Sequence, residues 1–437
     1  MGVSLFLVAI IVEAALAAFC ITTKSNQQKA RSIIRIVALV FFLLLTFIQV
    51  IDWSLRYYAL AALLFVLAAM GALDLLRSEE KKNVHKPMRV VLRAIGMTML
   101  IFLLTLPAII FPQYTPLEAS GEYRVATAAF TYTDTNRVET YTNTGEHRKL
   151  NVQFWHPEAA ESTYPLIVFS HGGISTRLSN ESLYLELASN GYVVCAVDHT
   201  YHCLFTKDED GRTIFIDRAY MQELSAEDAK SDRQQSYECY QKWMKTRTDD
   251  MNFVLDHILS QVENDAENTV YELIDKASIG VMGHSLGGAA ALGVGRMRDD
   301  VSAIVALESP FLCDIKGVAD GEFAFVDESY PVPVLNVYSD SSWSHLAEWP
   351  QYAENYALLS ASDATAFNVH ISGVGHFTLT DLALSSPFLT RMFNGQKSTT
   401  STEHCLKTIN KVCLEFFDCY LKGEGGGVIW SGGKTEE

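Results

Sequence analysis

The chain has 437 residues, of which 49% are hydrophobic, and a formal net charge of −17. Residues 1–111 hold eleven basic and five acidic residues, so residues 112–437 carry a net charge of −23. A segment this acidic excludes nucleic acid and anionic lipid as partners held by bulk charge. The contrast between the two parts predicts two unlike domains.

Four apolar stretches fill the N-terminal part: Val3–Ile21, Ile36–Ile51, Tyr57–Leu73 and Ala94–Phe111. Each approaches the roughly 17 to 25 residues that cross a bilayer as a helix. No Lys or Arg precedes the first stretch and basic residues follow it, which argues against a cleaved signal peptide. We therefore expect a membrane region with four transmembrane helices over residues 1–111.

The connectors between these stretches predict the orientation. Basic residues gather after the first stretch (Lys24, Lys29, Arg31, Arg35) and after the third (Arg77, Lys81, Lys82, Lys86, Arg89, Arg93). By the positive-inside rule these two connectors are cytoplasmic. The expectation is a multi-pass protein of the cell membrane in which the domain after the fourth stretch is extracytoplasmic.

The part beyond the membrane region is predicted to be one α/β domain over residues 123–422. Residues 112–122 are expected to form a linker and residues 423–437 a disordered tail. Val125–Tyr132 and Leu150–Trp155 predict an opening antiparallel pair, after which strand and helix patterns alternate as far as Ile371. Such alternation favours a mostly parallel sheet with helices on both faces. Residues 198–236 form either a lid or a surface excursion, and residues 237–262 a helix.

A buried strand, Pro165–Ser170, leads into the tripeptide His171-Gly172-Gly173. In α/β-hydrolases the second oxyanion donor lies on the loop after an early strand. We therefore expect the backbone N–H of Gly173 to be one of two donors that hold the negative charge of a tetrahedral intermediate.

The stretch Gly283-His284-Ser285-Leu286-Gly287 reads G-x-S-x-G between an apolar run and a small-residue helical run. This is the strand, sharp turn and helix of a nucleophile elbow, in which the serine hydroxyl stands clear of the sheet. Ser285 is therefore the candidate nucleophile, and the N–H of Leu286 the candidate first oxyanion donor.

The candidate general base is His376, on the loop Gly373-Val374-Gly375-His376-Phe377 after the last predicted strand. His199 and His202 come too early in the chain for the order Ser, acid, His. They are expected to be ordinary polar or packing residues, as are His284 and His404.

The acid has two candidates. Glu308 ends the predicted strand Ser302–Leu307, and Asp340 follows the predicted strand Val332–Tyr338. Both lie at the carboxyl end of a strand on the same edge of the sheet, where either could orient His376. The general topology of α/β-hydrolases favours the later strand and hence Asp340.

From Phe169 to His376 the chain resembles the platelet-activating factor acetylhydrolases of the lipoprotein-associated and intracellular type II group. The resemblance is carried by Phe169-Ser170-His171-Gly172, by Ala188–His199, by Gly283–Ala289, by Ala306-Leu307-Glu308 and by Gly375-His376-Phe377. In that family the acid follows the strand after the nucleophile helix in an Ala-Leu-Asp context. The resemblance therefore favours Glu308 over Asp340, with Glu where the family has Asp.

These features predict that residues 123–422 form an α/β-hydrolase domain. They also predict a membrane-anchored serine ester hydrolase that needs neither a metal nor another cofactor. Its expected substrate is a lipid or small ester; the resemblance implies phospholipids with a short or oxidised sn-2 acyl chain. Two alternatives stay open, since the same fold hosts many functions: an acyltransferase to an envelope acceptor, and a non-catalytic ligand-binding membrane sensor. The sequence does not indicate an oligomeric state.

Overall fold

The computed structural model describes residues 1–77, 86–158, 162–264, 269–360 and 365–424. The chain divides into two compact units, Met1–Thr115 with Leu384–Leu389, and Pro116–Ala383 with Thr390–Glu437. The domain limits expected from the sequence, at residues 111, 122 and 422, stay predictions. Most of the expected disordered tail, residues 425–437, lies outside the described residues.

The first unit contains four helices that are long and apolar enough to cross a membrane: α1 (Gly2–Thr22), α2 (Gln28–Phe47), α3 (Leu55–Leu76) and α4 (Pro87–Ile110). Helices α2 and α4 begin earlier than predicted, because the basic residues of the connectors form their first turns. Long basic side chains can keep their charge in water while their stems lie along apolar surface. Lys81 and Lys82 of the second basic connector lie outside the described residues.

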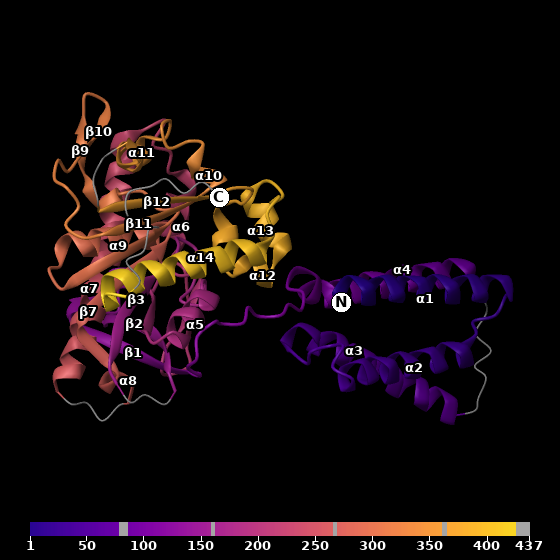
Figure 1. The fold of residues 1–437 in the computed structure, drawn as a ribbon. Helices are drawn as coiled ribbons and strands as arrows, with labels where there is room; N and C mark the ends of the chain where they lie inside the picture. The colour runs from indigo at the N-terminus through magenta and orange to yellow at the C-terminus, as the bar shows by residue number, and fades with distance from the viewer. Residues whose placement is uncertain (78–85, 159–161, 265–268, 361–364, 425–437) are drawn as a thin grey trace. The chain divides into compact units, whose positions relative to one another are not determined.

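Small residues let these helices pack closely in pairs, α1 with α4 and α2 with α3 (Figure 1). A Cβ on Gly2 would lie 2.5 Å from the carbonyl oxygen of Ala108, and one on Gly71 would lie 2.8 Å from that of Ser32. Close backbone approach at small residues is how apolar helices associate where lipid removes the hydrophobic driving force.

The second unit is built on an eight-stranded sheet with the order β1-β2-β4-β3-β7-β8-β11-β12. Its strands are β1 (Val125–Val138), β2 (His147–Pro157), β3 (Tyr164–Ser170), β4 (Val193–Asp198), β7 (Ile274–His284), β8 (Val301–Leu307), β11 (Val334–Ser339) and β12 (Ala366–Ile371). The opening pair is antiparallel, as predicted, and β2 also pairs antiparallel with β4. All other pairs in this sheet are parallel.

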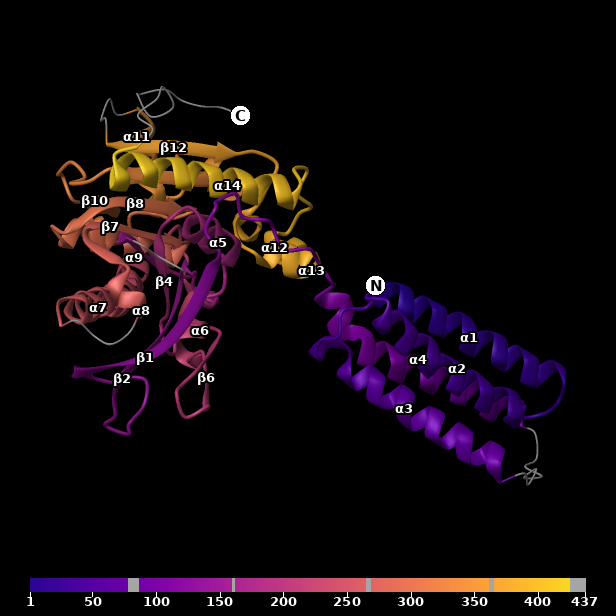
Figure 2. The same ribbon diagram turned by 60° about the horizontal axis from the view of Figure 1, so that its bottom comes forward.

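Helices cover both faces of this sheet. Helices α5 (Glu181–Ser189) and α14 (Thr402–Phe417) pack on one face, and α7 (Arg233–Glu263) and α9 (Leu286–Met297) on the other (Figure 2). Every residue of β3 is buried, as expected of a parallel strand covered on both sides. The predicted mostly parallel sheet between two helical layers is thus confirmed.

The remaining elements form excursions from this core. They include two small hairpins, β5–β6 (Phe205–Lys207 and Thr213–Phe215) and β9–β10 (Ile315–Ala319 and Glu322–Phe325). The short helices are α6 (Arg218–Ala226), α8 (Thr269–Glu272), α10 (Asp340–Trp343), α11 (Ala353–Ser360), α12 (Leu382–Ser385) and α13 (Pro387–Asn394). Residues 198–236, expected as a lid or excursion, contain β5, β6 and α6. The predicted helix 237–262 lies within the longer α7.

Candidate active site

Ser285 occupies the turn between β7 and α9 with φ 56° and ψ −126°, a conformation that is costly for a residue with a side chain. Glycines make the turn possible. A Cβ on Gly283 would lie 2.3 Å from the carbonyl carbon of Gly287, and one on Gly287 would lie 2.0 Å from the carbonyl oxygen of Ser170. Ser285 therefore caps the N-terminus of α9 in the geometry expected of a nucleophile elbow, and it is partly exposed.

The two residues that carry the expected oxyanion donors, Gly173 and Leu286, lie near each other. Leu286 is the first residue of α9, so its N–H is one of those without an intrahelical acceptor. Gly173 follows β3, and a Cβ on Gly173 would lie 3.2 Å from Cδ1 of Leu286. A Cβ on the preceding Gly172 would lie 3.6 Å from Cβ of Ser285. The loop after β3 thus reaches the nucleophile turn.

His376 lies on the loop after β12, beside the elbow. Its N–H donates to Oγ of Ser341 at 3.0 Å, and Nε2 of His284 donates to its carbonyl oxygen at 3.2 Å. The two imidazole rings are 4.5 Å apart between centroids. Burial lowers the pKa of His376 to about 4, so the ring is neutral near pH 7 and able to accept a proton.

Within the described residues, the His376 imidazole makes no hydrogen bond to Ser285 or to Glu308. Hydrogen bonds between catalytic groups are often long without substrate and shorten when substrate binds. The structure therefore brings the elements that carry the three residues to one edge of the sheet without closing the chain of hydrogen bonds between them.

The two candidate acids differ in what they bind. Both carboxylate oxygens of Asp340 are engaged, one with Nε2 of His370 at 2.8 Å and the other with the N–H of Gly373 at 2.8 Å. Glu308 is buried, and its Oε2 accepts the N–H of Ser339. Its Oε1 has no hydrogen-bond partner among the described residues. The neighbouring Ser339 and Ser342 favour the ionised form of Glu308. Glu308 thus keeps one oxygen without a hydrogen bond of its own, whereas both oxygens of Asp340 are engaged, one of them by His370.

Burial raises the pKa of Glu308 to about 7. Buried carboxyl groups whose pKa is shifted this far are common at functional sites. One oxygen of this group, Oε1, also has no hydrogen-bond partner in the described part of the chain. Glu308 also has φ 53°, a positive value like that of Ser285.

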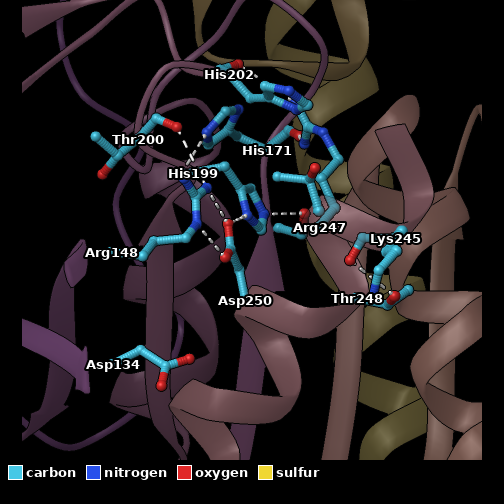
Figure 3. Close-up of polar contacts among 12 residues, drawn as sticks. Asp134, Arg148, His171, His199, Thr200, His202, Lys245, Arg247, Thr248 and Asp250 are labelled. Carbon is cyan, nitrogen blue, oxygen red and sulfur yellow. Dashed lines mark hydrogen bonds and ion pairs between the residues drawn. The ribbon is translucent and has the colours of Figure 1, made fainter. Parts of the chain in front are cut away.

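A network that the sequence did not reveal lies beneath the oxyanion loop (Figure 3). Nε2 of His199 accepts from Oγ of Ser170 at 2.8 Å, and its Nδ1 donates to Oδ2 of Asp250 at 3.0 Å. Arg148 binds both oxygens of Asp250, each at 2.6 Å. Burial opposes ionisation of Asp250, but the charge of Arg148 outweighs it and lowers the pKa of that carboxyl.

Ser170, His199 and Asp250 thus repeat the hydrogen-bond order of a catalytic triad. Each is 0% exposed, so substrate has no route to Ser170. Burial also lowers the pKa of His199 to about 4, which keeps the ring neutral between its two partners. The network is therefore structural: it ties β3, β4 and α7 together behind the oxyanion loop, and His199 is a packing residue as expected.

One group of donor atoms in the described part of the chain is close enough for a metal ion: those of His171, Asp198 and Cys203, all within 4.8 Å of one another. Two of its members are already engaged. The ring of His171 donates to the carbonyl oxygen of Gly172 and accepts the N–H of His199, while Asp198 pairs with Arg177. These contacts give the residues a structural role without an ion.

Comparisons with known proteins show the family and the fold of the chain. The family model described as platelet-activating factor acetylhydrolase, isoform II, matches residues 125–430. The chain belongs to this family. The matched segment spans the whole sheet, the elbow, Glu308 and His376, and the membrane region precedes it.

Curated relatives include platelet-activating factor acetylhydrolases of Gallus gallus (22% identical, 59% of this chain and 62% of the relative), Canis lupus familiaris (34%, 30% and 31%) and Cavia porcellus (22%, 62% and 61%). The chain thus spans less than two thirds of the length of each. A ferulic acid esterase from Streptomyces cinnamoneus is similar in structure, with a TM-score of 0.52 at 22% identity over 71% of this chain and 93% of the esterase. This likeness confirms the α/β fold.

Proposed function

We propose that the protein is a membrane-anchored serine ester hydrolase that works through an acyl-enzyme. The observation that carries the proposal is the strained turn at Ser285, a partly exposed residue at the N-terminus of α9. The family and the esterase-like fold support an ester as the substrate.

In the proposed reaction, Ser285 attacks the ester carbonyl while the neutral His376 takes its proton. The carbonyl oxygen gains negative charge, which the N–H groups of Gly173 and Leu286 stabilise. Glu308 is the group that holds the His376 imidazole and stabilises its cation. His376 then protonates the leaving alcohol, and water repeats the sequence to release the acid and restore Ser285.

We further propose that the substrate is a phospholipid with a short or oxidised sn-2 acyl chain, or a related carboxylic ester. The curated relatives are named as acetylhydrolases of platelet-activating factor. The four helices suited to a membrane support an enzyme held near lipid. The basic connectors after the first and third helices favour an extracytoplasmic hydrolase domain.

The test is the rate of hydrolysis by the purified full chain of p-nitrophenyl esters from acetyl to decanoyl and of a short-chain phosphatidylcholine. We expect activity on the shortest esters and on the phospholipid, and its loss in Ser285→Ala. Ser285→Ala should also abolish labelling by a fluorophosphonate probe. Activity near wild type in Ser285→Ala would remove Ser285 as the nucleophile. Probe labelling without turnover would point to transfer of the acyl group to another acceptor.

A further inference from the structure

Arg247 is a buried cation directly behind the oxyanion loop. It lies in the middle of α7 and is 0% exposed. Its guanidinium donates to the carbonyl oxygens of His171 at 2.6 Å, Gly172 at 3.3 Å and His202 at 3.4 Å. Unlike Arg148, it forms no ion pair with a carboxylate in the described part of the chain. A buried charge held by backbone carbonyls and one hydroxyl, without a carboxylate, is costly, so its position calls for a functional reason.

The bonds of Arg247 fix the peptide that carries the second oxyanion donor. The carbonyl of Gly172 and the N–H of Gly173 belong to one planar trans peptide, so they point in opposite directions. Arg247 and Nδ1 of His171, at 2.6 Å, both hold that carbonyl oxygen. The N–H of Gly173 is thereby directed away from Arg247. A hydrogen-bonded carbonyl also polarises its peptide and strengthens the N–H as a donor.

A second contact fixes the next peptide in the loop. The hydroxyl of Tyr220 donates to the carbonyl oxygen of Gly173 at 3.2 Å and accepts from Arg247 at 3.4 Å. The ring of Tyr220 stacks on that of His202, with centroids 3.8 Å apart. Three consecutive carbonyls, those of residues 171–173, are thus held by Arg247 directly or through Tyr220.

We infer that Arg247 is a positioning residue for the oxyanion hole, aligning the Gly173 N–H through the His171 and Gly172 carbonyls. The inference rests on the proposed function, since it assigns Arg247 a part in the same reaction. Arg247 touches neither substrate nor Ser285 and acts only through the loop. A flat guanidinium with several donors suits this task, whereas an ammonium group can hold the carbonyls only as a point charge.

The test is Arg247→Lys, which keeps the charge but loses the fork of donors. Removing one oxyanion donor costs about 100- to 1,000-fold in rate. Misaligning it should lower kcat by about 10- to 100-fold and leave KM within about threefold. The affinity for an alkylboronic acid, which forms a tetrahedral adduct on the serine, should fall by a similar factor. If Arg247 had only a structural role, its replacement would not lower kcat and the affinity for the boronic acid together while KM stays constant.

Arg296→Lys is the matched control. Arg296 lies in α9 and binds both oxygens of Asp314, each at 2.8 Å, away from the oxyanion loop. We expect a lower thermal midpoint for this variant with kcat and boronate affinity unchanged. If Arg247→Lys does not fold, Tyr220→Phe removes only the hydroxyl that links Arg247 to Gly173, and should lower kcat several-fold at constant KM.

Folded Arg247→Lys or Tyr220→Phe with wild-type kcat and boronate affinity overturns the inference. Ser285→Ala is measured alongside. If Ser285→Ala loses activity but Arg247→Lys keeps wild-type kcat and boronate affinity, only the role of Arg247 is refuted. Retained activity in Ser285→Ala refutes the proposed function instead.

Discussion

Replacing Glu308 by Gln is the sharpest test of the proposed triad. The amide would keep one oxygen for the Ser339 N–H and place an NH₂ where the unpartnered Oε1 now lies. That NH₂ is a donor, so it cannot accept the N–H of the His376 ring and favours the wrong tautomer. The corresponding change in a serine protease costs about 10⁴ in kcat. We expect Glu308→Gln to lower kcat/KM by about 10³ to 10⁴, or about 4 to 5.5 kcal/mol.

The structure also predicts that this variant folds. Because the pKa of Glu308 is raised to about 7, the side chain is neutral in a large fraction of molecules at neutral pH. A neutral amide of the same shape should therefore leave the thermal midpoint nearly unchanged. The assay is the hydrolysis of p-nitrophenyl acetate, with the rate of fluorophosphonate labelling as a second readout.

Asp340→Asn is the matched control, because it removes the other candidate carboxylate at the same edge of the sheet. It weakens the contacts to His370 and to the Gly373 N–H. The side chain of Asp340 is 38% exposed, so we expect a small loss of stability and a rate within several-fold of wild type. A loss of a thousandfold in Asp340→Asn, with Glu308→Gln near wild type, would refute the assignment and return the acid to the later strand.

Three further predictions concern pH, the elbow and the membrane. Since Glu308 must be ionised to stabilise the His376 cation, kcat/KM should rise as the pH passes about 7. In Glu308→Gln, the rise in the remaining activity with pH should move towards pH 4, the pKa of His376. An unmoved limb would show that another group titrates. Gly287→Ala, whose Cβ would lie 2.0 Å from the Ser170 carbonyl oxygen, should lose activity and about 1–3 kcal/mol of stability. Gly317→Ala, with nothing within 4 Å of its Cβ, should keep both activity and stability. Equal losses in the two variants would refute the steric argument. Protease added to intact cells should degrade the hydrolase domain, and complete protection would reverse the predicted topology.

The sequence predicted those features that depend on local patterns. The elbow needs a strand, two glycines and a helix within a short stretch, so the turn at Ser285 could be predicted from Gly283, Gly287 and the runs that flank them. The four apolar helices and the opening antiparallel pair are also local patterns. Predictions were less accurate at the starts of α2 and α4. There the helix includes basic residues that precede the apolar stretch, so hydropathy places its beginning too late.

Contacts between distant segments could not be predicted in this way. Asp250 lies 102 residues from Arg148 and 51 from His199, and Arg247 lies 76 from His171. Nothing in the pattern of α7 shows which polar residues turn towards the sheet. The available signal is the spacing of Arg247 and Asp250, which are three residues apart and therefore share one face of the helix with apolar neighbours. The choice between Glu308 and Asp340 likewise depends on which oxygen is already engaged.

Backbone strain links the nucleophile turn to Glu308. Ser285 and Glu308 both have positive φ and lie at the ends of the neighbouring strands β7 and β8. The N–H of Ser285 donates to the carbonyl oxygen of Leu307 at 2.8 Å. Oγ of Ser309 donates to the carbonyl oxygen of Ser285, also at 2.8 Å.

The two strained residues are thus held in one hydrogen-bonded unit. Strained backbone persists only where the surrounding structure enforces it, and it gathers at functional sites. Asp340 starts the short helix α10 and is not among the residues with positive φ in the described part of the chain. The strain therefore gives a second reason, independent of hydrogen bonding, to place the acid at Glu308.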